Sequence, residues 1–123
     1  VALGHEFCGA FTNDDMSVKE LQCAGAGVGD QVWPMPMTDT WDKMMDSEIA
    51  DIRNISLDKY AGSATAAAFL KRFINDGQKW VHLDIAGMAM TDRERGLHVK
   101  GATGIPVRSL VKLALNLASH PSP

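Results

Sequence analysis

The stretch AGSATAAAFLKRFINDGQKWVHLDIAG, residues 61–87, decides the fold, because a helical pattern runs directly into a strand pattern there. In its first half the apolar residues recur at the spacing of one helix face, and Ser63 stands where a capping hydroxyl is expected. The apolar residues of this face are Ala66, Phe69, Leu70 and Phe73. The spacing therefore predicts an amphipathic helix that packs through this face.

The second half of the stretch predicts a strand. Val81, Leu83 and Ile85 alternate with polar residues, which is the period-two pattern of a half-buried strand. His82 and Asp84 share the other face, where a histidine beside a carboxylate could bind a metal ion or form a base with its orienting partner. Two ligands do not make a site and no third stands at a suitable spacing, so a structural role is the favoured interpretation.

Two further patterns precede this unit in the sequence. The run NDD, residues 13–15, offers capping oxygens to a helix that carries Val18, Leu21 and Ala24 on one face. The run VWPMPM, residues 32–37, predicts an extended connector, because each proline lacks a backbone donor and disfavours helical geometry in the residue before it.

A last helix is predicted near the C-terminal end of the chain. Pro106 suits the first helical turn, since its missing N–H has no partner there. The apolar face of this helix consists of Val107, Leu110, Val111 and Ala114. Helix, strand, loop and helix in this order form the pattern of an α/β domain.

Composition excludes several classes of function. The net charge of −3 over 123 residues provides no basic surface, so binding to nucleic acid is disfavoured. No apolar run approaches the roughly 18 residues of a membrane span, so no membrane partner is expected. Cys8 and Cys23 have neither the spacing of a metal site nor the density of a disulfide scaffold, which favours a reducing cytoplasm.

Segments distributed over nearly the whole chain resemble the leucyl aminopeptidases, the cytosolic two-metal exopeptidases of the M17 family. In chain order they are VALG (1–4), NDD (13–15), VWPMPM (32–37), WD (41–42), ADIRNI (50–55), AGSATAAAFLKRF (61–73), WVHLDIAGMA (80–89) and KGATGIPVRSLV (100–111). HLDIAG combined with KGATGIPV is a specific pair of motifs. On these motifs the chain is identified as a member of that family.

The resemblance implies part of a mixed-sheet α/β/α sandwich of the zinc-exopeptidase type, with residues 1–123 as the C-terminal portion of the catalytic domain. Such a sheet is incomplete without upstream strands, and its exposed edges predict poor solubility or self-association. The chain starts with Val1 inside an apolar run and not with Met, which we interpret as a cut chain. The family's metal-binding signature NTDAEGR does not occur, so no catalytic or metal-ligating residue is assigned here.

The implied function is hydrolysis of leucine-like N-terminal residues from peptides by two divalent metal ions, Mn or Zn, in the cytoplasm. This chain alone is expected to bind no metal and to be inactive. Ala86, Gly87 and Ala89 map onto the wall that receives the first side chain of the peptide, with Met88 and Met90 as possible neighbours. Core filling is the commoner role of methionines.

The resemblance also implies a homo-oligomer, because members of the family assemble as hexamers. An alternative function is therefore a non-catalytic assembly module that retains a subunit contact surface. Two segments depart from the family pattern. Residues 56–60 replace a glycine-rich, arginine-containing loop, and TDRERGLHV, residues 91–99, forms a variable loop whose charges are expected to be solvated.

Overall fold

The computed structural model describes residues 2–120. Three strands form a central mixed sheet in this structure. β1 (Cys8–Thr12) lies in the middle of three strands in the order β2-β1-β3. β2 (Val32–Pro34) runs parallel to β1, and β3 (Val81–Asp84) runs antiparallel to it. A separate two-stranded sheet pairs β4 (Met90–Thr91) with β5 (Gly101–Ala102).

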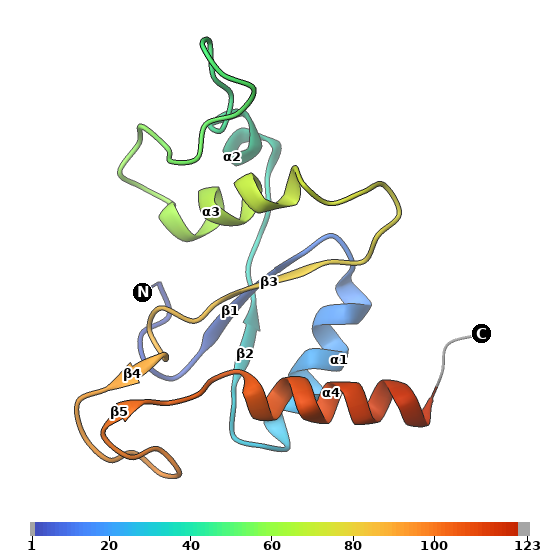
Figure 1. Ribbon diagram of the computed structural model, residues 1–123, viewed down its shortest axis with the longest axis vertical. Helices are drawn as coiled ribbons and strands as arrows, with labels where there is room; N and C mark the ends of the chain where they lie inside the picture. The colour runs from blue at the N-terminus through green and yellow to red at the C-terminus, as the bar shows by residue number, and fades with distance from the viewer. Residues whose placement is uncertain (1, 121–123) are drawn as a thin grey trace.

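Helices cover both faces of the three-stranded sheet (Figure 1). α1 (Asp15–Ala26) joins β1 to β2, and α4 (Val107–Ser119) packs against α1 on the same face. α2 (Asp39–Lys43) and α3 (Gly62–Lys71) lie together on the opposite face. The expected α/β fold with a mixed sheet between helical layers is confirmed.

Adjacent residues of β1 hold the two halves of the core, because successive side chains of a strand point to opposite faces. The cluster on the α1 face consists of Ala10, Val18, Leu21 and Val32, with Leu83 and Leu113 packed against it. The cluster on the α3 face consists of Phe11, Ala64 and Ala67, with Met35, Trp41 and Trp80 packed against it. Both layers of helices are therefore fixed to the same strand.

The sequence patterns gave no prediction for β1. Cys8, Gly9, Ala10 and Phe11 are all buried, so this strand shows no alternation of apolar and polar residues. β2 falls inside the predicted connector 32–37, which is extended as expected but also pairs with β1. Pro34 stands at the end of β2, where the loss of one donor is tolerated.

α3 and α4 form as predicted but do not pack through their predicted faces. In α3 the small residues Ala64, Ala67 and Ala68 are buried, whereas Phe73, just beyond the helix, is 64% exposed. Ala66 and Leu70 are exposed as well. The small residues Ala64 and Ala67 pack against the large Phe11 side chain of β1.

α4 packs through Ser109 and Leu113, and its predicted face is exposed. Its first apolar residues, Val107, Leu110 and Val111, are between 48% and 60% exposed. No helix within residues 2–120 is both long enough and apolar enough to cross a membrane.

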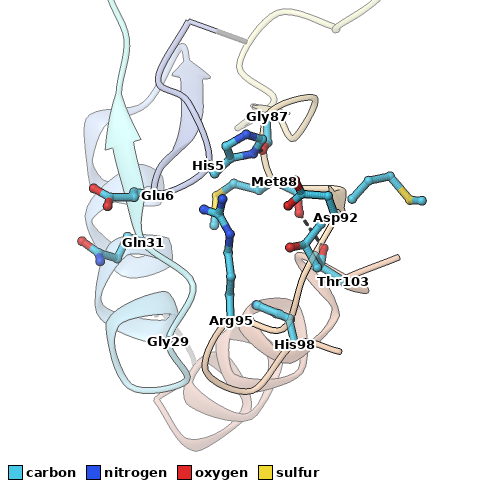
Figure 2. A pocket seen from close by; sticks show the side chains of 12 residues that line it. His5, Glu6, Gly29, Gln31, Gly87, Met88, Asp92, Arg95, His98 and Thr103 are labelled. Atoms are coloured by element: carbon cyan, nitrogen blue, oxygen red, sulfur yellow. Dashed lines mark hydrogen bonds between the residues drawn. The ribbon is translucent and has the colours of Figure 1, made fainter. Parts of the chain in front are cut away.

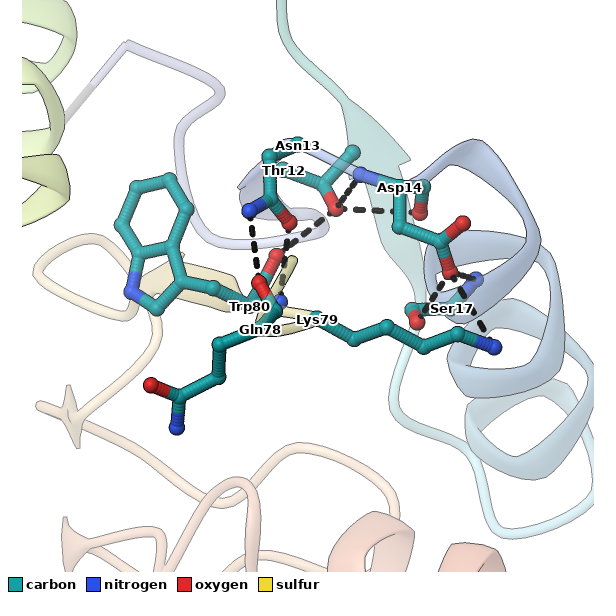
Figure 3. A network of polar contacts seen from close by, with 7 residues as sticks. All are labelled: Thr12, Asn13, Asp14, Ser17, Gln78, Lys79 and Trp80. Atoms are coloured by element: carbon teal, nitrogen blue, oxygen red, sulfur yellow. Dashed lines mark hydrogen bonds and ion pairs between the residues drawn. The ribbon is translucent and has the colours of Figure 1, made fainter. Parts of the chain in front are cut away.

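A polar corner connects the end of β1 to the start of β3 (Figure 3). Asn13 donates through Nδ2 to the Gln78 carbonyl at 2.8 Å and accepts from the Trp80 N–H at 2.9 Å. Thr12 Oγ1 donates to the Trp80 carbonyl at 2.8 Å. The predicted cap is confirmed beside it, because the Asp14 carboxylate accepts from the Ser17 N–H at 3.0 Å.

The end of α1 is fixed against the start of α4 through Asp30. A side chain at Gly25 would bring its Cβ to 2.2 Å from the Asp30 carbonyl oxygen, so only glycine fits this approach. The Asp30 carboxylate is buried and accepts from Ser109 Oγ at 2.6 Å. Arg108 lies 3.6 Å from the other carboxylate oxygen.

Candidate functional site

The predicted site residues lie in the turn that follows β3. Asp84 accepts the Ala86 N–H at 3.0 Å, and the Ile85 carbonyl accepts from the N–H groups of Met88 and Ala89 at 2.9 and 2.8 Å. These bonds close residues 85–89 into a compact segment, which we call the β3–β4 turn. The strand therefore ends at Asp84, and the following residues are held at the end of the sheet.

Asp84 also connects this turn to α3. Ser63 Oγ donates to its second carboxylate oxygen. Burial raises the pKa of Asp84, but the hydrogen bonds from Ser63 and the Ala86 N–H, together with nearby positive charge, hold the pKa below its ordinary value. Asp84 is therefore an ionised anchor between the turn and the start of α3.

The prediction that Ser63 caps α3 is wrong. The residue at the N-cap position is Ala61, in left-handed geometry at φ 54°, and no side chain caps the helix there. Ser63 is the second residue of the helix, after Gly62, and its hydroxyl donates to the Asp84 carboxylate. A sequence pattern cannot separate these two uses of a serine, because the partner carboxylate is 21 residues away.

His82 does not form a metal centre with Asp84 in this structure. Its ring stacks on Trp80 at 6.4 Å with an interplanar angle of 12°, and it lies 6.1 Å from the Phe11 ring. Burial lowers the pKa of His82, partly opposed by the charge of Asp84. Residues 2–120 contain no group of three or more His, Cys, Asp or Glu side chains that could hold a metal ion.

An open cleft of about 850 Å³ lies between the start of α3 and the end of β3, and we call it the α3 cleft. Its wall is mainly apolar and includes Met35, Trp41, Ala64, Ile85 and Ala86. Ala86 is exposed to the cleft, and its small side chain occupies little of the space there. The arrangement can receive an apolar side chain of a ligand next to the β3–β4 turn.

Gly87 lies on a different cavity, of about 380 Å³ (Figure 2). Its carbonyl oxygen is 2.6 Å from His5 Nδ1, and Met88 lies beside it in the wall. Ala89 lines neither space, and its carbonyl accepts from the Thr103 N–H at 2.9 Å. The structure thus brings Ala86, Gly87 and Ala89 into one turn, but Ala86 lines the α3 cleft, Gly87 lines the smaller cavity and Ala89 lines neither.

Several residues of these two cavities carried no signal in the sequence. Trp41 and Ala64 reach the α3 cleft only through the packing of α2 and α3 on the sheet. His5 and Arg95 line the smaller cavity from segments that are far apart in the sequence. Their sequence separation explains why no local pattern pointed to them.

The fold is an α/β structure similar to part of a leucine aminopeptidase. A mutant of tomato leucine aminopeptidase has a similar structure, with a TM-score of 0.83 and 36% sequence identity. The similarity covers 94% of this chain and 22% of the tomato chain.

The sequence matches the cytosol aminopeptidase family, catalytic domain, over residues 1–111, and the chain belongs to that family. The cytosol aminopeptidase of Rickettsia prowazekii (strain Madrid E) is 49% identical over 113 residues, which are 91% of this chain. A probable cytosol aminopeptidase of Alkaliphilus metalliredigens (strain QYMF) is 43% identical over 117 residues, which are 95% of this chain. The chain spans 23% of the length of each of these relatives.

Proposed function

We propose that this chain is the C-terminal portion of the catalytic domain of a leucyl aminopeptidase, which removes leucine-like residues from the N-termini of peptides. The match to the family over residues 1–111 carries this proposal. The names of the relatives support peptide hydrolysis and a cytoplasmic location, since both are cytosol aminopeptidases. The name of the structural relative supports leucine as the favoured N-terminal residue.

In this proposal Ala86, Gly87 and Ala89 form the wall that receives the first side chain of the peptide. The exposure of Ala86 in the mainly apolar α3 cleft supports the assignment. Gly87 and Ala89 contribute through the turn, which the hydrogen bonds of Asp84 and Ile85 keep in one conformation. Small residues at these positions leave space for a branched apolar side chain.

The two divalent metal ions of the family, Mn or Zn, are assigned to residues outside this chain. The described side chains do not fit a metal ion, because no three potential ligands converge within residues 2–120. Both carboxylate oxygens of Asp84 accept hydrogen bonds, one from Ser63 and one from the Ala86 N–H. This chain alone is therefore expected to be inactive, and no catalytic step is assigned to it.

A chimaera tests the proposed site. This segment would replace the aligned 113 residues of the Rickettsia prowazekii protein, and hydrolysis of leucyl and alanyl 4-nitroanilides would be measured with Mn²⁺ or Zn²⁺. We expect activity from the chimaera and none from the 123-residue chain. Metal-dependent hydrolysis of the leucyl substrate by the pure chain would contradict the inactivity.

Ala86→Phe in the chimaera tests the wall residue. The larger side chain is expected to lower kcat/KM for the leucyl substrate by about tenfold or more, and that for the alanyl substrate much less. Ala50→Phe is the matched control, because Ala50 lies in an exposed loop away from the α3 cleft. Equal losses on both substrates would mean that Ala86 does not determine side-chain preference.

A second candidate function is a non-catalytic assembly module that joins subunits of a homo-oligomer, with a hexamer as the expected form. The exposed apolar residues of α4 favour it, because Leu110, Val111 and Leu115 are each 48% exposed or more. Size-exclusion chromatography of the chain mixed with a full-length relative tests this role. A chain that stays monomeric and does not exchange into the relative's oligomer would exclude it.

A further inference from the structure

The smaller cavity, which we call the Arg95 cavity, is a candidate binding site separate from the α3 cleft. Its charged and apolar side chains include Glu6, Met88, Met90, Asp92 and Arg95, and its volume is about 380 Å³. This volume is at the lower end of the range for small-molecule pockets. Figure 2 shows the Arg95 side chain extending into the middle of the space, with Asp92 and Thr103 on the wall across from it.

Arg95 is placed in this cavity without an acceptor. Its Nε is buried and makes no hydrogen bond, and within residues 2–120 its guanidinium forms no ion pair. By comparison, Arg72 binds the carboxylates of Asp42 and Asp46 at 3.1 and 2.7 Å. The end of the Arg95 side chain, unlike the buried Nε, extends into the cavity (Figure 2), where a ligand oxygen can accept hydrogen bonds from the guanidinium.

This arrangement contradicts the expectation for the loop of residues 91–99, whose charges were predicted to be simply solvated. Arg93 and Glu94 are exposed as expected. Arg95 is half-buried, and its side chain extends into the cavity (Figure 2). The loop therefore presents one of its charges to the cavity.

The charges of the wall specify the ligand. A carboxylate is the natural partner of the Arg95 guanidinium, which offers two parallel donors. Glu6 and Asp92 in the same wall repel a simple anion and favour a ligand that also carries a positive group. A metal ion is not that ligand, since these side chains do not converge as metal ligands within residues 2–120.

We propose that the Arg95 cavity binds a free α-amino acid with an apolar side chain. Its carboxylate faces Arg95, its ammonium group faces Asp92, and its side chain packs on Met88 and Met90. This site does not depend on the proposed peptide site, which lies in the α3 cleft. The two spaces share the β3–β4 turn, because His5 contacts the Gly87 carbonyl from the wall of the Arg95 cavity.

Isothermal titration calorimetry of the 123-residue chain tests the ligand class. The probes are L-leucine, 4-methylpentanoate, which lacks the ammonium group, and 3-methylbutylamine, which lacks the carboxylate. Leucine is expected to bind best, the carboxylate more weakly and the amine not at all. Absence of leucine binding at millimolar concentration, or equal binding of the amine, would overturn the proposal.

Arg95→Gln tests the residue and Arg93→Gln is its control, since both changes remove one positive charge from the same loop. Arg95→Gln is expected to weaken leucine binding by about tenfold or more, and Arg93→Gln by less than about twofold. Unchanged leucine affinity in folded Arg95→Gln would overturn the assignment. If Arg95→Gln fails to fold, Asp92→Asn serves instead, and it should weaken leucine but not 4-methylpentanoate.

Discussion

α1 and α4 lie in contact on one face of the sheet, but only α1 has its apolar stripe covered. Leu21 of α1 is 2% exposed, whereas Leu115 of α4 is 60% exposed. α1 joins two neighbouring parallel strands, so its apolar face is held against the sheet. α4 follows β5, contacts α1 through Leu113, and donates from Ser109 to Asp30 in the loop after α1. The spacing of apolar residues therefore predicts which face of a helix can be buried. The elements next to the helix determine whether that face is buried.

The largest expected difference between the two helices is in the cost of truncating a leucine. Leu21→Ala should lower the free energy of unfolding by about 2–5 kcal/mol, because it leaves a cavity between Ala10, Val18 and Val32. Leu115→Ala, the same change on α4, should cost less than about 0.5 kcal/mol. Urea unfolding of the two variants measures both effects. Equal costs would show that the α4 face is covered in solution.

The second-largest expected effect on stability comes from the hydrogen bond between Ser109 of α4 and Asp30 in the loop after α1. Ser109→Ala removes the hydroxyl that donates to the buried Asp30 carboxylate at 2.6 Å, so the carboxylate loses a partner. We expect a loss of about 1–3 kcal/mol in the free energy of unfolding. Ser119→Ala, at the exposed end of α4, is the control. If the two variants unfold at the same urea concentration, Asp30 does not fix α4.

The starts of the two helices should differ in their response to acid. The side-chain and backbone hydrogen bonds from Ser17 lower the pKa of Asp14, which caps α1, whereas no side chain caps α4 at Pro106. A lowered pKa means that Asp14 stabilises the fold above the unfolded value of about 3.9 and loses this effect as pH falls through the folded value.

Asp14→Asn tests this, because asparagine also caps helices but does not titrate. The variant should show a shallower loss of stability between about pH 5 and pH 2 than the unmodified chain in thermal unfolding series. Asp15→Asn, the same substitution one residue later, leaves the cap in place and is the control. If Asp14→Asn leaves the pH dependence of stability unchanged, protonation of Asp14 does not contribute to acid unfolding.

The smallest effect on stability should come from charging the exposed face of α4. Val111→Lys with Leu115→Lys is expected to change the free energy of unfolding by about 0.5 kcal/mol or less, since neither residue is buried. The same double variant should reduce the predicted self-association, because the face would no longer offer apolar area. Sedimentation velocity measures this. Unchanged association would place the contact elsewhere, with the open edges of β2 and β3 as the next surface to test.

Much of the fold followed from local patterns. The cap at Asp14 and the buried face of α1 depend on residues close together in the sequence, and both were predicted correctly. The alternation in β3 was also sufficient to find that strand. β1 was missed because a strand buried on both faces shows no alternation, and CGAFT contains small residues that strands do not favour.

The candidate site was less predictable, because its contacts join distant segments. Family resemblance selected Ala86, Gly87 and Ala89, but only the fold shows that Ala86 and Gly87 face different spaces and that Ala89 lines neither. The role of Ser63 depends on Asp84, and the placement of Arg95 depends on a cavity lined by distant segments of the chain. No periodicity within a short window contains such information.

The polar corner at Thr12 and Asn13 has a consequence for the order of folding. The hydrogen bond from Thr12 to Trp80 spans 68 residues, whereas β1 and β2 are separated only by α1 and a short loop. Closing a long loop costs more chain entropy before any contact compensates for it. We therefore expect the β1-α1-β2 unit to form before β3 joins it. On this order, the turn that carries Ala86, Gly87 and Ala89 acquires its shape after the unit has formed.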